Sequence, residues 1–209
     1  MKRLSFTLAL LIGILLFFGC KSEANYGAEY LPYLTMPKLD VLKALNLSEE
    51  ELTEARPATG FFSIPTVRKI HGLDFNVRLD FISYLDSQKE EGKELSPPDG
   101  TFYAFRYYRQ EKEPTDVDYA VAEKLLDDLT KLYGEPTDNP WQVGRHISEL
   151  DGISDIRDGK HSGALERWNV PIPQEWTDQI DPERYYLEAT LNVGKWFNFE
   201  GSLEIYLEY

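Results

Sequence analysis

Strict alternation of apolar and polar side chains marks the stretch Phe75-Asn76-Val77-Arg78-Leu79-Asp80-Phe81. A period of two places the apolar side chains of a strand on one face and the polar ones on the other. The pattern therefore predicts a half-buried strand of an antiparallel sheet, since a strand covered on both faces would be apolar throughout. The dipeptide His71-Gly72 predicts a tight turn that leads into it from a shorter strand near Val67–Ile70.

Four further segments carry the strand pattern. Thr101–Arg109 has aromatic side chains at alternate positions, and Ala164–Val170 is a shorter stretch of the same kind. Alternation also runs from Tyr185 to Val193 and from Leu203 to Tyr209. These last two segments predict a hairpin around Gly194–Gly201.

Helical periodicity appears in two regions. Asp116–Tyr133 carries a leucine-rich apolar stripe, and Gly134 directly after it is a suitable residue for ending a helix. The region Lys38–Glu54 predicts a broken pair of helices, because Ser48 and Glu51 have the spacing of a capping box in its middle.

The order of these elements predicts an α+β fold. We expect one antiparallel sheet of about five to seven strands, with the helices packed on one face. The order of a helix followed by about three strands occurs twice, which is compatible with two α-β-β-β units. The segment Pro136–Gly163 is expected to be a long loop.

The N-terminus has the features of a secretory signal. Lys2 and Arg3 are followed by an apolar run from Leu4 to Phe18, and then by Gly19 and Cys20. The run has about 15 residues, whereas a helix that crosses a bilayer needs about 20. Cys20 is the only cysteine, so no disulfide can form within the chain.

The junction at residues 16–20 resembles the lipobox of bacterial lipoproteins, although Phe17 stands where that family usually has leucine. The resemblance implies a lipidated (palmitate-bearing) Cys20 and an extracytoplasmic, membrane-anchored protein on the outer face of the plasma membrane or, in a two-membrane cell, at the outer membrane. Residues 1–19 would be the signal peptide, 20–36 the lipidated cysteine and tether, and 37–209 a single domain. Ordinary cleavage after Ala24, or an uncleaved anchor, are the alternatives.

The chain is strongly acidic. It holds 22 basic and 36 acidic side chains, and removal of residues 1–19 takes away two of the basic ones and leaves a formal charge of −16. Such a protein is repelled by nucleic acid phosphates, so a nucleic acid partner is not expected. The charge favours basic partners, or it serves solubility alone.

No motif for catalysis is present. The sequence has no nucleophile elbow, no phosphate-binding glycine loop and no zinc-binding pair of histidines. His146 and His161 share a loop with Asp151, Asp155 and Asp158, which would suit a metal site, but their spacing matches no known coordination pattern. We expect a solvated loop, with no metal and no cofactor.

Aromatic residues in the expected loops are the candidate binding residues. Trp196, Phe197 and Phe199 lie in the last predicted hairpin, and three tryptophans lie in or beside the long loops: Trp141, Trp168 and Trp176. Exposed aromatic clusters mark interfaces. The alternative is that these rings cover the edge of the core.

The residues Leu132–Thr137, followed by Trp141, resemble a turn of small uncharacterised bacterial lipoproteins. The expected architecture is also similar to that of the beta-lactamase inhibitory protein family, which is built from tandem helix-plus-sheet units. Neither resemblance assigns a site residue. We expect a non-enzymatic binding or interaction module whose partner is an envelope protein, a peptide or a glycan. The alternative is a cell-envelope hydrolase with a scattered carboxylate/His site.

Overall fold

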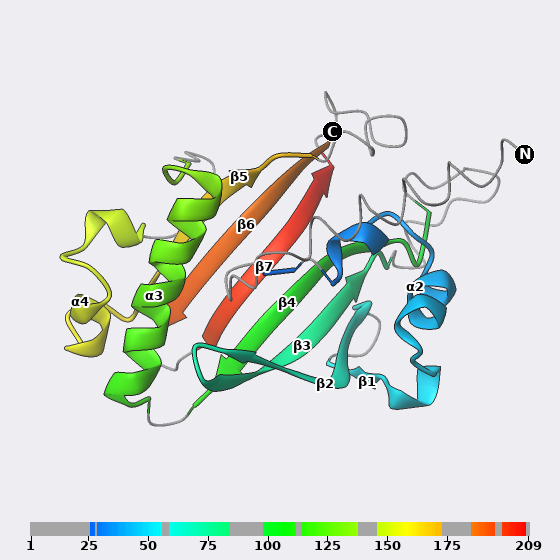
Figure 1. The fold of residues 1–209 in the computed structure, drawn as a ribbon, viewed down its shortest axis with the longest axis horizontal. Coiled ribbons are helices and arrows are strands. Elements are labelled where there is room, and N and C mark those ends of the chain that lie inside the picture. Colours follow the sequence, from blue (N-terminus) through cyan, green and yellow to red (C-terminus); the bar gives the residue numbers. More distant parts are fainter. Residues whose placement is uncertain are drawn as a thin grey trace, which may run out of the picture.

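The computed structural model describes residues 26–27, 29–55, 59–83, 98–111, 114–137, 146–172, 185–194 and 198–207. Its α+β class confirms the prediction from the order of elements (Figure 1). The helices are α2 (Lys38–Leu45), α3 (Asp116–Tyr133) and α4 (Ser154–Arg157), with short 3-10 turns at Leu31–Tyr33 (η1), Glu49–Glu51 (η2) and Ile147–Glu149 (η4). The strands are β1 (Thr53–Glu54), β2 (Phe61–Ile70), β3 (Leu73–Phe81), β4 (Phe102–Gln110), β5 (Gly163–Val170), β6 (Tyr185–Gly194) and β7 (Asn198–Leu207).

The strands pair antiparallel in the spatial order β1-β2-β3-β4-β7-β6-β5. The alternation in β3 explains how the sheet is oriented. The apolar side chains of the alternating stretch, from Phe75 to Phe81, are at most 1% exposed. Leu79 lies opposite Phe62 of β2 and Phe105 of β4. The core thus lies against one face of the sheet, and α3 packs on β5 and β6 on this face (Figure 1).

The turn at His71-Gly72 is confirmed. Both residues have positive φ, 46° and 88°, which is the geometry of a two-residue type I′ hairpin. Strand β2 is longer than predicted, because it begins at Phe61 rather than near Val67. A shift in register between Ile64 and Val67, around Pro65, breaks the period of two and hides the first half of the strand from sequence analysis.

One of the two predicted helical regions is confirmed in full, and the other only in part. Helix α3 has the predicted bounds, and a capping box of Thr115 and Asp118 begins it. The capping box at Ser48 is also confirmed: the Ser48 backbone N–H donates to Glu51 Oε2 over 2.8 Å. It begins the single turn η2, however, and not a second helix.

The predicted N-terminal boundary of the domain, at residue 37, is wrong, because the core already includes earlier residues. Residues 26–27 and 29–36, here called the N-terminal strap, were expected to belong to a tether, but Tyr26, Tyr30 and Leu34 are buried in the core. The Tyr26 hydroxyl bonds Asp128 of α3 over 2.8 Å, and the Tyr30 ring packs on Phe105. The strap has no periodic pattern because, apart from the single turn η1, it forms neither a helix nor a strand. The predicted signal segment and Cys20 lie outside the described residues.

Strand β7 changes the predicted last hairpin. It begins at Asn198, so Phe199 lies in a strand opposite Arg109 and not in a loop. The expected turn over Gly194–Gly201 is therefore too long at its C-terminal end. Within the described part of the chain, no helix is both long enough and apolar enough to cross a membrane.

Asp118 at the start of α3 provides a test of how the fold is stabilised. Burial alone would raise the pKa of Asp118, but hydrogen bonds from Thr115 and an ion pair with Arg109 outweigh burial and hold the pKa below its usual 3.8. A pKa that is lower in the folded state gives stability that is complete above the unfolded pKa and is lost as the pH falls through the folded pKa.

We therefore expect Asp118→Ala to lower the free energy of unfolding by about 1–2 kcal/mol at pH 7, since a cap is lost. The difference from wild type should shrink below about pH 4, where the wild-type carboxylate takes up its proton. Urea unfolding at several pH values measures this, with the exposed neighbour Asp116→Ala as the matched control. An equal cost at pH 7 and pH 3 would show that the charge of Asp118 is irrelevant.

Candidate functional site

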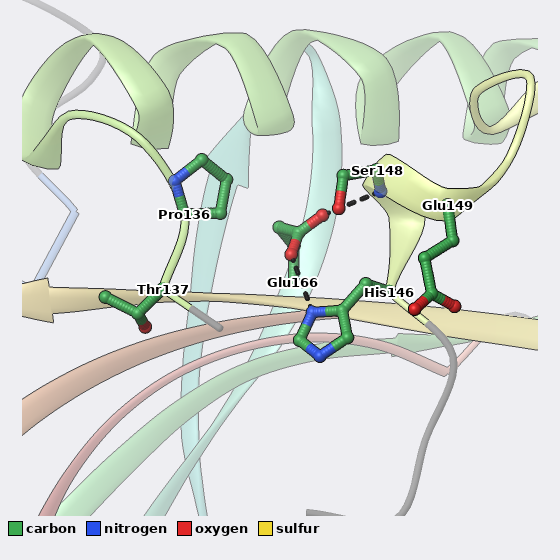
Figure 2. Close-up of a pocket in the computed structure, with 6 residues that line it drawn as sticks. All are labelled: Pro136, Thr137, His146, Ser148, Glu149 and Glu166. Atoms are coloured by element: carbon green, nitrogen blue, oxygen red, sulfur yellow. Dashed lines mark hydrogen bonds and ion pairs between the residues drawn. The ribbon is translucent and has the colours of Figure 1, made fainter. Parts of the chain in front are cut away.

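A cavity of about 210 Å³ lies beside strand β5 (Figure 2). Three segments line it: the chain that follows α3, the turn η4 and strand β5. Its lining residues are Pro136, Thr137, His146, Ser148, Glu149 and Glu166.

The outer edge of β5 holds both walls of the cavity in place. The Thr137 backbone N–H donates to the Arg167 carbonyl over 2.8 Å. His146 pairs with Leu165 in a parallel bridge. The walls are therefore fixed by backbone contacts to a single strand, which makes the geometry of the cavity a property of the sheet.

Glu166 is a carboxylate at a core position. In β5 it alternates with Ala164 and Trp168, lies opposite Leu191 of β6, and is only 1% exposed. Burying a charged group is costly unless polar partners replace water. Two such partners are present: His146 Nδ1 lies 3.0 Å from Glu166 Oε1, and the Ser148 backbone N–H donates to Oε2 over 2.9 Å.

This arrangement fixes the histidine ring. An ionised carboxylate only accepts hydrogen bonds, so Nδ1 of His146 must donate, and the neutral ring then has its lone pair on Nε2. Figure 2 shows Nε2 on the side of the ring away from Glu166. A histidine held in one tautomer by a buried carboxylate can bind a ligand's hydrogen-bond donor or accept a proton.

The pairing of His146 with Glu166 was not anticipated from the sequence. His146 was grouped with the acids of its own loop, but the partner of its ring comes from β5. The signal that was available is the single acid in an otherwise apolar row of β5, formed by Ala164, Glu166, Trp168 and Val170. A lone acid at a core position implies a buried polar partner.

Asp155 and Asp158 of that loop have partners of their own: Arg157 Nε donates to Asp158 Oδ1 over 3.0 Å. The Asp155 carboxylate accepts the Asp151 backbone N–H over 3.0 Å and bonds Lys160 Nζ over 2.5 Å. The hydrogen bond from Lys160 is the main reason why the pKa of Asp155 lies below its usual value. Among the residues that the structure describes, no group of three or more histidine, cysteine or acidic side chains could hold a metal.

Most residues of the predicted aromatic cluster lie outside the part of the chain that the structure describes. Trp141, Trp176, Trp196 and Phe197 lie outside the described residues, and Phe199 lies in β7. Trp168, which was grouped with the loop tryptophans, is instead fully buried on the core face of β5. Its place in the core follows from the alternation of β5.

The tautomer of His146 is a direct test of this geometry. We expect nitrogen-15 NMR of the full chain above pH 8 to show His146 protonated on Nδ1 and unprotonated on Nε2, because Glu166 accepts from Nδ1. In Glu166→Gln this preference should weaken, since an amide can donate as well as accept. A protonated Nε2 with a bare Nδ1 in wild type would rule out the pair as described.

Comparison of the chain with protein-family models, with curated proteins and with solved structures gives no match.

Proposed function

We propose that this protein is a lipid-anchored extracytoplasmic lipoprotein that acts as a non-enzymatic binding module, and that the His146–Glu166 pocket receives a polar group of its partner. The observation that carries the proposal is the buried carboxylate that orients a histidine at a cavity. A few polar groups fixed in a concave site are typical of ligand recognition. The partner is an envelope protein, a peptide or a glycan.

The negative charge of the protein indicates which chemical groups of a partner the pocket would favour. The protein without residues 1–19 has a formal charge of −16, and the pocket itself contains Glu149 and Glu166. Partners with basic or hydrogen-bond-donating groups are therefore favoured over anionic ones. The aromatic residues proposed from the sequence, Trp196, Phe197, Trp141 and Trp176, would supply apolar contact area to the same partner.

The same pair supports a second candidate function. A carboxylate that orients a histidine through Nδ1 is also how general bases are positioned in hydrolases. A cell-envelope hydrolase that uses His146 as the base for a water molecule is therefore the alternative. It differs from binding in one respect, since the partner would be cleaved.

The order of elements supports a further proposal about architecture. The order α2-β2-β3-β4, with the short strand β1 between α2 and β2, is followed by α3-β5-β6-β7, with the short helix α4 between α3 and β5. The two sets of strands meet where β4 pairs with β7. We infer two α-β-β-β units whose strands share one sheet, with the helices on one face.

The anchor can be tested separately from the pocket. We expect wild type to incorporate labelled palmitate and to fractionate with membranes, and Cys20→Ser to do neither, because it lacks the thiol that would carry the lipid. Ser22→Ala is the matched control. Membrane association without labelling would instead support an uncleaved apolar anchor, and labelled Cys20→Ser would exclude this cysteine.

The pocket is tested by photo-cross-linking in the cells that produce the protein. We expect a photoreactive residue at Glu149 to capture one abundant partner, and His146→Ala to lower the yield at least tenfold. Because this variant takes one partner from the buried Glu166, circular dichroism must show that it is folded. The same residue at exposed Asn169 on the opposite face of β5 is the control. Equal capture at both positions, or no effect of His146→Ala, would contradict the proposed pocket. Recovery of cleaved partner only with intact His146 would favour the hydrolase.

A further inference from the structure

A second cavity of about 320 Å³ lies beside β2, near the other edge of the sheet. The N-terminal strap, the chain at the end of α2 and the bulged part of β2 line it. Its lining residues are Glu29, Tyr30, Leu45, Leu47, Ile64, Thr66, Val67 and Arg68. The volume lies in the range of pockets that hold small molecules.

An ion pair lies in the wall of this cavity. Arg68 Nη1 donates to Glu29 Oε1 over 3.0 Å, and the Tyr107 hydroxyl donates to the same oxygen over 2.8 Å. Burial, followed by the nearby charge of Glu29, raises the pKa of Tyr107 well above its usual range, so this hydroxyl remains a donor. Glu29 is therefore fixed by two partners on one of its two oxygens.

Glu29 and Arg68 each keep hydrogen-bonding groups that no described residue uses. Within the described residues, Glu29 Oε2 and the Nε and Nη2 groups of Arg68 have no hydrogen-bond partner. The side chains of Arg68 and Glu29 are 36% and 32% exposed, so a molecule from solvent can reach them. The cavity thus offers one cationic donor and one anionic acceptor next to each other.

The rest of the wall is largely apolar. Leu45 and Leu47 pack against the core from the end of α2, and Ile64 is a buried residue of β2. A ligand that uses the whole cavity therefore needs an anionic group, a cationic group and an apolar part within a few bonds of one another.

We propose that this cavity binds a free apolar α-amino acid as its zwitterion. The carboxylate accepts hydrogen bonds from Arg68, the ammonium group donates to Glu29, and the side chain contacts Leu45, Leu47 and Ile64. A fatty acid has a carboxylate but no ammonium group, so its negative charge would lie next to that of Glu29 and be repelled. An alkyl amine has no carboxylate, so its positive charge would be repelled by Arg68 in the same way. The site lies in a different cavity from His146 and is independent of the function proposed above.

Titration of the full chain in detergent with four related probes tests the proposal. L-leucine has all three features, N-acetyl-L-leucine lacks the ammonium group, L-leucinamide lacks the carboxylate, and glycine lacks the apolar side chain. We expect saturable calorimetric binding of L-leucine and at least tenfold weaker binding of each other probe. Absence of saturable L-leucine binding at 10 mM (about the weakest affinity worth calling specific), or equal binding of L-leucinamide, overturns the proposal.

Variants assign the binding to this cavity. Arg68→Gln should weaken L-leucine binding to the level of L-leucinamide, while Lys69→Gln should leave it unchanged, because Lys69 is exposed and does not line the cavity. Because Arg68 also holds the N-terminal strap, circular dichroism must show that Arg68→Gln is folded. If it is not, methyl NMR of wild type decides: shifts of Leu45 and Leu47 on addition of L-leucine support the site, and shifts confined to residues elsewhere contradict it.

Discussion

The antiparallel pairing of β4 with β7 is the constraint on which the rest of the structure depends. It joins strands that are about a hundred residues apart in the sequence and places Phe105 opposite Leu203. The pairing makes one sheet from β1–β4 on one side and β5–β7 on the other, so one apolar face runs across both. Such a face must be covered, and α3 and the N-terminal strap both bury side chains against it.

Local patterns predicted the elements well where one pattern covers the whole element. The alternation of β3 and the apolar stripe of α3 are examples, and the bounds of α3 were found to the residue. Prediction was poorer where partners are distant in sequence. The bulge at Pro65 depends on pairing with β3, and the burial of Tyr26 depends on Asp128 and His71. The partner of His146 could not be found either, because β5 lies 20 residues further along the chain.

The two cavities share a physical origin. Each lies near an edge of the sheet, where strand pairing ends and irregular chain takes its place. In each, a carboxylate is held by a donor from another segment: Glu166 by His146, and Glu29 by Arg68 and Tyr107. These contacts stabilise the irregular segments and also place polar groups where a partner can meet them. The residues that we propose for binding are therefore also residues that stabilise the fold, which is why variants must be checked for folding.

The central claim is that the pairing of β4 with β7 unites β1–β4 and β5–β7 in one sheet. Native-state hydrogen exchange of the full chain tests it most directly. If one sheet unites them, amides of Val77 in β3 and Ala189 in β6 should exchange through the same global unfolding, with equal opening free energies and equal dependence on urea. The two sets of strands would then form one cooperative unit that carries both cavities. If the β6 amides instead open at a cost lower by about 2 kcal/mol or more, with a smaller urea dependence, the two sets of strands unfold separately and the account is contradicted.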